Sequence, residues 1–147
     1  MLKQERGINL MTSQNQAVRP APIVDEPSKP FFDAAADAVL LLQRCDMCRA
    51  YLWPLREICT ECLSTDLSWA PSTGKGSVHS FVIMHRLFHP AFQEDVPYNL
   101  TVVQLDEGPR VTSIIRGTDN EDISVGMNVT ANWHDVNGTP LLHFEAS

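Results

Sequence analysis

Four cysteines, all within eighteen residues, constrain this chain more than any other feature. They form two Cys-x-x-Cys pairs, Cys45 with Cys48 and Cys59 with Cys62, separated by ten residues. Each pair can curl into a tight turn that aims two thiolates at one point, and two such turns supply the four soft ligands of a tetrahedral zinc site. Because four protein ligands leave no position for water, the spacing predicts one structural zinc ion that does no chemistry.

Two other uses of the cysteines compete with zinc. A disulfide framework needs an oxidising compartment, and a bond within a Cys-x-x-Cys pair is geometrically strained. A redox-active pair is expected beside a strand-helix-strand pattern, which this sequence lacks. Zinc is therefore the favoured interpretation, although the gap of ten residues is shorter than in many ribbons.

The composition describes an ordinary globular protein rather than a partner for polyanions. The chain has 147 residues, 44% hydrophobic and 20% charged, which fits one domain or two very small ones. The formal charge is -7, and four thiolates with one Zn²⁺ would take it to roughly -9. This acidic balance argues against nucleic acid as a partner.

Nothing in the sequence predicts a membrane segment. The longest apolar run, residues 38–42, has five residues, whereas a spanning helix needs about 20. The first thirty residues contain no apolar stretch like that of a secretory signal. We therefore expect a cytoplasmic protein, in which thiols stay reduced and available to metal, and Met1 and Met11 remain alternative native starts.

The N-terminal half is predicted to contain an arm followed by a metal-stapled unit. Residues 1–29 are polar and proline-bearing with no periodic apolar face, which is typical of a flexible arm. Ser28 as N-cap and Pro30 in the first turn predict a helix whose Phe31 and Phe32 form an anchor. Residues 39–43 are short and apolar and predict a strand leading into the first cysteine pair. The helix and ribbon together occupy residues 30–70.

The remainder, residues 71–147, reads as a small antiparallel β-domain. Glycine, asparagine, aspartate and proline separate five β-rich segments, and Asn137-Gly138 is a strong two-residue hairpin signal. The predicted strands are residues 76–87, 98–105, 110–116, 127–134 and 141–145. Five such strands in about seventy residues favour a closed OB-fold barrel, with an SH3-like barrel or a sandwich fragment as competing topologies. The fold class expected is thus mainly β, with an N-terminal helix, a rubredoxin-like zinc ribbon and a five-stranded OB-fold barrel.

The histidines do not assemble into a recognisable catalytic set. There are five of them: His79, His85, His89, His134 and His143. His79 and His85 can share a strand face, but six residues place them about 20 Å apart. No Gly-x-Ser-x-Gly motif is present, and metal would occupy all four cysteines. We expect no active site on this chain alone.

A long connection between the first two barrel strands, residues 86–97, is the candidate binding loop. Arg86, Phe88, His89 and Phe92 lie on it together with two prolines. Exposed aromatic side chains on such a loop favour contact with another subunit or a ligand. The alternative is a loop that folds back and buries Phe88 and Phe92 in the core of its own barrel.

An OB-fold also raises the possibility of single-stranded nucleic acid. The candidate stacking platforms are Phe81, Phe88, Tyr98 and Trp133. However, from Gly74 onward the chain has four basic residues and nine acidic ones. No basic stripe is available to bind phosphates, so nucleic acid is disfavoured.

Several stretches together resemble one family, the zinc-ribbon plus OB-fold proteins that accompany thiolases and related enzymes. The resemblance runs from about Phe31 to Phe144. Its motifs are Cys45-Asp-Met-Cys48, Trp53-Pro54-Leu55-Arg56, Cys59-Thr-Glu-Cys62, Trp69, Gly74-Lys-Gly76-Ser-Val78, Pro97-Tyr98, Val103-Gln-Leu105-Asp-Glu-Gly108, Arg110 and Val125-Gly126-Met127-Asn-Val129. Each motif alone is weak, but all of them in this order are specific. Two positions depart from the pattern: Arg49 replaces the usual glycine after the second cysteine, and Trp53-Pro54 replaces a double proline.

The resemblance implies an accessory subunit that carries no catalytic residue. In such systems the ribbon and helix dock on thiolase-fold or ketosynthase-like partners, which supply the nucleophile, and the OB domain lies near their acyl site. Partners in the family include phloroglucinol acetyltransferase subunits, acetoacetyl-CoA thiolase and thiolase-like aldolases. We therefore expect a hetero-oligomer with Phe31, Phe32, Arg86, Phe88, His89 and Phe92 at the partner or the substrate channel. A stand-alone acyl-CoA-binding protein, using Lys75, Arg86 or Arg110 for the phosphates, is the alternative.

Overall fold

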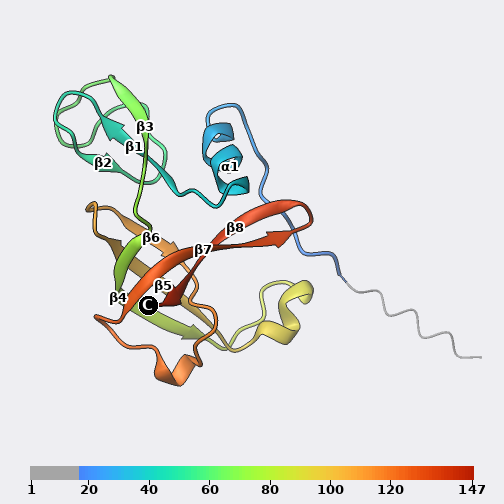
Figure 1. The fold of residues 1–147 in the computed structure, drawn as a ribbon. Helices are drawn as coiled ribbons and strands as arrows, with labels where there is room; N and C mark the ends of the chain where they lie inside the picture. The colour runs from blue at the N-terminus through green and yellow to red at the C-terminus, as the bar shows by residue number, and fades with distance from the viewer. Residues whose placement is uncertain (1–16) are drawn as a thin grey trace, which may run out of the picture.

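Two β-sheets, one short α-helix and two short 3₁₀ helices make up the regular structure in the part of the chain that the computed structural model describes, residues 17–147 (Figure 1). The elements are α1 (Lys29–Ala36), β1 (Leu41–Cys45), β2 (Tyr51–Leu52), β3 (Leu67–Pro71), β4 (Lys75–Met84), η1 (Pro90–Asp95), β5 (Tyr98–Leu105), β6 (Arg110–Ser113), η2 (Asn120–Asp122), β7 (Asn128–Val136) and β8 (Thr139–Ala146). The choice between Met1 and Met11, and the first sixteen residues of the predicted arm, lie outside the described residues. No helix within residues 17–147 has the length and apolar character needed to cross a bilayer.

The helix forms where the sequence predicts it, but its N-terminus differs in detail. Pro30 occupies the first turn, whereas the Ser28 side chain makes no capping bond to the helix. The Ser28 hydroxyl instead bonds Asp25 in the preceding turn. At the other end Ala38 adopts a φ of 59°, and the Val39 N–H donates to the Ala34 carbonyl at 2.9 Å. Because this helix ending absorbs residues 37–40, the strand predicted at 39–43 starts two residues later, at Leu41.

A small three-stranded sheet, in the order β2-β1-β3, forms the zinc ribbon. All its pairs are antiparallel, and β1 is the central strand. Gln43 of β1 is buried and ties the sheet to the following loop: its Nε2 donates to the Arg56 carbonyl at 3.0 Å, and its Oε1 accepts from the Arg56 N–H at 2.6 Å. The ribbon is therefore held at its centre by a buried side-chain bridge as well as by strand pairing.

The five C-terminal strands form one curled antiparallel sheet in the order β6-β5-β4-β7-β8. Its two edges meet through a parallel bridge between Ile115 and Phe144, where the Phe144 N–H donates to the Ile114 carbonyl and the Arg116 N–H donates to the Phe144 carbonyl, each at 2.9 Å. This bridge explains why β6 ends at Ser113 rather than at the predicted 116. Residues 114–116 leave β5 in order to close the sheet, which agrees with an OB-fold rather than a sandwich fragment.

The hairpin predicted at Asn137-Gly138 is confirmed. These two residues connect β7 to β8, and both have positive φ, 52° and 84°. That pair of conformations is what a two-residue turn matching the twist of the strands requires. The long curved hairpin of β7 and β8 crosses beneath α1 (Figure 1), and α1 contacts both β8 and β1.

The core lies inside the curled sheet and extends toward the ribbon. Phe144, Val78, Val103 and Val129 are at most 1% exposed, and the same cluster contains Leu40 and Leu42 from the start of the ribbon. A second, much smaller cluster consists of Cys45, Leu52 and Cys59. The ribbon thus joins the main core at one end, while its cysteine end has only three buried residues of its own.

Gly76 is expected to be intolerant of any side chain. A Cβ at this position would lie 2.4 Å from the Gln104 carbonyl oxygen, because the backbones of β4 and β5 approach closely there. We expect Gly76→Ala to lower the free energy of unfolding by about 1 to 3 kcal/mol, since the paired strands must separate. Urea unfolding would measure this, with Ser77→Ala at the next, half-buried residue as the control. Equal stability of the two variants would contradict the close approach.

Candidate metal centre and binding surfaces

The four cysteines come together at the tip of the ribbon, as the spacing predicts. Cys45 is the last residue of β1, Cys48 lies in the turn that follows, and Cys59 and Cys62 lie on a second turn before β3. Their Sγ atoms all lie within 4.8 Å of one another, with 3.5 Å between Cys45 and Cys62 and 3.6 Å between Cys48 and Cys59. Sulfurs on an ideal tetrahedron around zinc are about 3.8 Å apart. The donor set therefore fits one structural zinc ion.

The two turns are built alike, which explains how each cysteine pair aims at one point. In the first, the Arg49 N–H donates to the Cys45 carbonyl at 2.9 Å; in the second, the Leu63 N–H donates to the Cys59 carbonyl at 3.0 Å. Arg49 and Leu63 both adopt positive φ, 67° and 63°. For a side chain other than glycine this conformation costs about 1 to 2 kcal/mol. Arg49 thus takes up a conformation that glycine would adopt without this cost.

The electrostatics of the cluster also call for a cation. A backbone hydrogen bond from Cys48 lowers the pKa of the Cys45 thiol to about 7. The Ala50 amide likewise favours the Cys48 thiolate, but burial and the neighbouring thiols outweigh it and raise the pKa of Cys48 to about 12. Four adjacent thiols oppose one another's ionisation, and a divalent cation removes that opposition by binding all four thiolates.

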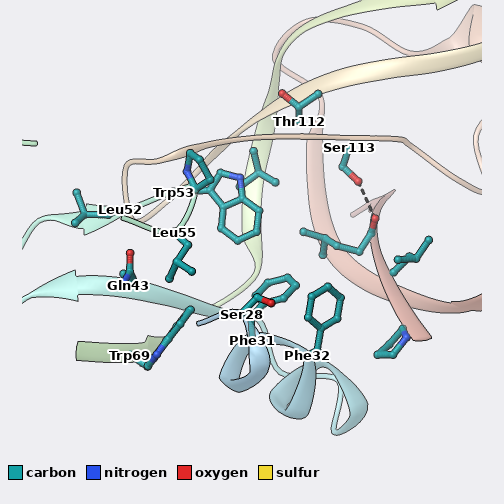
Figure 2. Close-up of a pocket in the computed structure, with 15 residues that line it drawn as sticks. Ser28, Phe31, Phe32, Gln43, Leu52, Trp53, Leu55, Trp69, Thr112 and Ser113 are labelled. Atoms are coloured by element: carbon teal, nitrogen blue, oxygen red, sulfur yellow. Dashed lines mark hydrogen bonds between the residues drawn. The ribbon is translucent and has the colours of Figure 1, made fainter. Parts of the chain in front are cut away.

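Phe31 and Phe32 lie between the ribbon and the barrel. The Phe31 ring contacts Phe32, Trp53 and Trp133, with centroids 5.2, 5.3 and 5.7 Å apart. Around them is an apolar cavity of about 320 Å³, walled by Leu55 and Trp69 on the ribbon side (Figure 2). Phe31 is therefore an internal anchor of α1. Its contact with Trp133 also occupies one of the aromatic rings considered as a stacking platform for nucleic acid.

The loop between β4 and β5 is partly folded onto its own barrel and partly exposed. Phe88 is 65% exposed, and the Arg86 guanidinium lies 5.3 Å from its ring centroid. Phe92 is half-buried beneath the Arg19 guanidinium and packs edge-on against His89. Arg19, on the described end of the predicted arm, also pairs with Asp95 at 2.8 Å. Of these two aromatic side chains, Phe88 is thus the exposed one.

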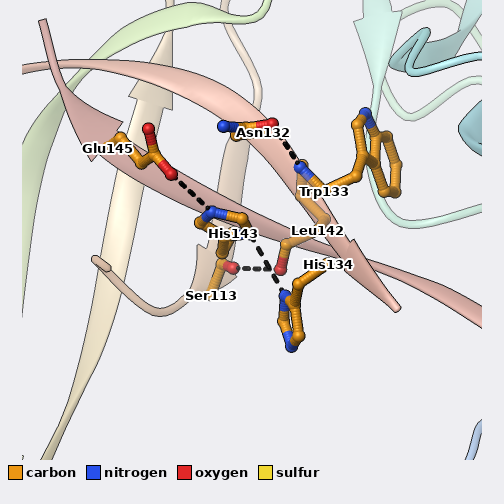
Figure 3. Close-up of polar contacts among 7 residues, drawn as sticks. All are labelled: Ser113, Asn132, Trp133, His134, Leu142, His143 and Glu145. Atoms are coloured by element: carbon orange, nitrogen blue, oxygen red, sulfur yellow. Dashed lines mark hydrogen bonds and ion pairs between the residues drawn. The ribbon is translucent and has the colours of Figure 1, made fainter. Parts of the chain in front are cut away.

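One polar cluster was missed by sequence reasoning. His143 is 3% exposed, and its Nδ1 lies 3.1 Å from the Nδ1 of His134 while its Nε2 lies 3.0 Å from the Glu145 carboxylate (Figure 3). A signal for this pair existed in the hairpin. A turn at Asn137-Gly138 opposes His134 to Leu141, which makes His143 its diagonal neighbour on the same face.

The cations proposed for a CoA site do not converge. Lys75 begins β4, whereas Arg86 follows its far end, a separation of about 30 Å along the strand. The Arg110 Nε donates to the Gln104 side chain at 2.9 Å on the neighbouring strands. No shared phosphate pocket links the three residues, so the structure disfavours a stand-alone acyl-CoA carrier of that design.

Comparison with known families settles what this combination of ribbon and barrel is. A model of the rubredoxin-like zinc ribbon domain of ChsH2 matches residues 32–68, and a model of the C-terminal OB-fold domain of ChsH2 matches residues 69–134. The chain belongs to the ChsH2 family. The family resemblance and the fold class inferred from the sequence are thereby confirmed.

Relatives within and around the ChsH2 family carry different descriptions. A probable enoyl-CoA hydratase alpha subunit of Thermomonospora curvata is 33% identical over 80% of this chain and 36% of the relative. A DUF35 domain-containing scaffold protein of Methanocaldococcus jannaschii is 34% identical over 60% of this chain and 62% of the relative. The chain therefore spans only about a third to two thirds of the length of these curated relatives.

A solved structure of the ChsH2 family matches almost end to end. The chain described as Ltp2-ChsH2(DUF35) aldolase superposes with a TM-score of 0.76 at 30% identity, covering 86% of this chain and 98% of that one. A DUF35-family protein of unknown function from Sulfolobus solfataricus superposes with a TM-score of 0.57 at 14% identity, which supports the fold alone.

Proposed function

We propose that this chain is a non-catalytic, zinc-stapled accessory subunit of a thiolase-like complex that carries out acyl transfer or aldol cleavage. The observation that carries the proposal is the match over 98% of a chain described as Ltp2-ChsH2(DUF35) aldolase. Relatives described as a scaffold protein and as an alpha subunit support a role within an assembly. The partner supplies the reacting groups, and this chain holds and shapes their surroundings.

The exposed apolar residues of the ribbon are the proposed docking surface. Met47 and Leu63 project from the two zinc turns and are 68% and 77% exposed, and Ile58 lies between them in sequence at 49%. Large apolar side chains gathered on one tip are typical of an interface. Zinc would keep this tip rigid, so that little conformational entropy is lost when the partner binds.

The loop between β4 and β5 is the proposed wall of the substrate channel. Leu87 and Phe88 are 42% and 65% exposed on it, and His89 and Phe92 position the loop from beneath. Loops carried on a rigid barrel are common places for such contacts. In this assignment Phe31 acts indirectly, because its contacts with Trp53 and Trp133 join the docking ribbon to the channel-lining barrel, and Phe32 packs against Phe31.

Co-expression with a thiolase-fold subunit from the same host is the test. We expect a stoichiometric complex in size-exclusion chromatography with light scattering. Met47→Asp should weaken it about tenfold or more, because a charge is placed in a desolvated contact. Val125→Asp, at an equally exposed residue before β7, is the matched control. A monodisperse monomer that binds acyl-CoA tightly and ignores the thiolase-fold subunit would instead support a stand-alone carrier.

A further inference from the structure

A second, larger cavity lies on the barrel, away from the zinc site. It has a volume of about 810 Å³, and its apolar wall residues come from the β4–β5 loop, from β5 and β8 and from the segment after β6, among them Phe88, Phe92, Tyr98 and Leu142. His134 and Arg116 also line it. Its wall is apolar over most of its area but also carries polar side chains, among them Asp95, Asn99 and Asn120. Its volume lies in the range of small-molecule sites.

Three hydrogen-bonded side chains on β7 and β8, those of His134, His143 and Glu145, lie at the polar end of this cavity. His143 is buried, and each of its ring nitrogens has a partner: Glu145 at 3.0 Å on one side and His134 at 3.1 Å on the other. Figure 3 shows the second nitrogen of the His134 ring pointing away from His143. The buried His143, which has a hydrogen-bond partner at each ring nitrogen, therefore lies behind His134, which lines the cavity.

The hydrogen bonds fix which nitrogen carries each proton. The bond from His143 lowers the pKa of Glu145, so that carboxylate is ionised and only accepts. A neutral His143 then carries its proton on Nε2, where it donates to Glu145, and its Nδ1 is left as an acceptor. His134 must donate from its own Nδ1, so its Nε2 presents a lone pair. The negative charge of Glu145 thus fixes the tautomer of His143 and, through it, the tautomer of His134, whose Nε2 is left as a hydrogen-bond acceptor.

The surroundings keep that acceptor neutral. Burial lowers the pKa of His134, and the positive charge of Arg116, of His143 when protonated, and of Arg19 lowers it further; together they outweigh the Leu141 backbone carbonyl, which raises it. Arg19 is already paired with Asp95, whereas Arg116 makes no salt bridge within residues 17–147. An unpaired guanidinium beside a neutral acceptor favours a ligand group that is a hydrogen-bond donor and gains partial negative charge when it donates.

We propose that this cavity binds an apolar molecule carrying an acidic hydroxyl, a phenol or an enol, and that His134 Nε2 accepts the hydrogen bond from that hydroxyl. The aromatic and aliphatic walls receive the ring system. Arg116 stabilises the electron-rich oxygen, and His143 with Glu145 acts as a positioning pair that holds His134 in the accepting tautomer. All residues of the site belong to this chain, although Phe88 and Phe92 also lie on the loop proposed above as the wall of the substrate channel.

Ligand discrimination by the full-length, zinc-loaded protein tests the proposal. The probes are 2-naphthol and 2-methoxynaphthalene, which are similar in size but differ in the O–H donor. Fluorescence titration should show 2-naphthol binding about tenfold more tightly, as expected for one well-placed hydrogen bond. His134→Phe should abolish the difference between the probes, and His79→Phe, at an exposed residue of β4 outside the cavity, should preserve it. Equal binding of the two probes by the unmodified protein, or no binding of either, would overturn the proposal.

The tautomers supply a second test that needs no substitution at His134. Long-range ¹H–¹⁵N spectra of the histidine rings should show His134 protonated on Nδ1 and His143 on Nε2 near neutral pH. Glu145→Gln should mix the tautomers, because an amide can donate as well as accept, and should reduce the preference for 2-naphthol. Glu145 is exposed, so this variant is expected to fold. Protonation of His134 on Nε2 in the unmodified protein would refute the assignment.

Discussion

Replacing Cys59 with serine is expected to unfold the tip of the zinc ribbon while leaving the barrel folded. Only Cys45, Leu52 and Cys59 form the buried cluster at that end, so little besides the metal holds it together. Zinc contributes about 10 to 16 kcal/mol to folding in comparable small metal-binding domains. Apolar burial by three residues cannot replace a contribution of that size.

Hydrogen exchange should locate the boundary of this local unfolding. The amides of Arg49, Cys59 and Leu63, which close the two zinc turns, should lose protection. The amides of Val78 and Val103 should keep theirs, because they lie in the core of the barrel. We expect the boundary to fall within β1, between Leu42, which packs in the barrel core, and Cys45, which binds metal.

The effect of Cys59→Ser on function is expected to appear in binding to the partner subunit. If the ribbon tip is the docking surface, Cys59→Ser and chelation of zinc should both abolish binding to the thiolase-fold partner. Thiolase-type chemistry retained by the isolated partner should be unaffected. Thr60→Ser, an exposed residue between two ligands, is the matched control. A Cys59→Ser protein that retains both ribbon protection and full assembly would show that zinc is not what stabilises the interface.

Phe144→Ala is expected to be the most damaging single substitution in the barrel. Phe144 is fully buried and is the largest side chain of the core, at the point where the two edges of the sheet meet. Removing its ring leaves a cavity that the surrounding strands cannot fill, at a cost of about 3 to 5 kcal/mol. In a chain of this length each kcal/mol lowers the melting temperature by about 2 to 4 °C, so a fall of about 10 °C is expected.

A conservative substitution separates the loss of volume from the loss of closure. Phe144→Leu retains much of the apolar volume and all of the backbone bonds to Ile114 and Arg116. It should therefore be markedly less destabilising than Phe144→Ala. Leu100→Ala, at a residue of β5 that is 40% exposed, should cost much less than either. A barrel that tolerates Phe144→Ala as well as Leu100→Ala would contradict the central position of this ring.

The features that are local in sequence were predictable. Two cysteine pairs specify a metal site because the chemistry of four thiolates depends on spacing alone. Asn137-Gly138 specifies a hairpin because both residues tolerate positive φ. The strand at residues 98–105 was placed correctly because strong turn signals bound it on both sides.

Features that depend on long-range contact were not predictable in the same way. The end of β6 is set by Phe144, some thirty residues further along the chain, which draws residues 114–116 away from β5. The role of Phe31 is set by Trp53, which follows β2 of the ribbon, and by Trp133 in β7 of the barrel. The hydrogen-bonded series Glu145, His143 and His134 can be predicted only from the hairpin register, because His134 and His143 are neighbours across two strands rather than along one.

The position of β1 has a mechanical consequence. The segment from Leu40 to Cys45 begins in the barrel core and ends as a ligand of the metal, so no free hinge separates the two sheets. Force applied at the ribbon tip reaches the barrel through β1, whose Leu42 packs in the barrel core, and through the short connection from β3 to β4, residues 72–74. A partner bound at the ribbon tip would therefore also determine the orientation of the β4–β5 loop relative to that partner.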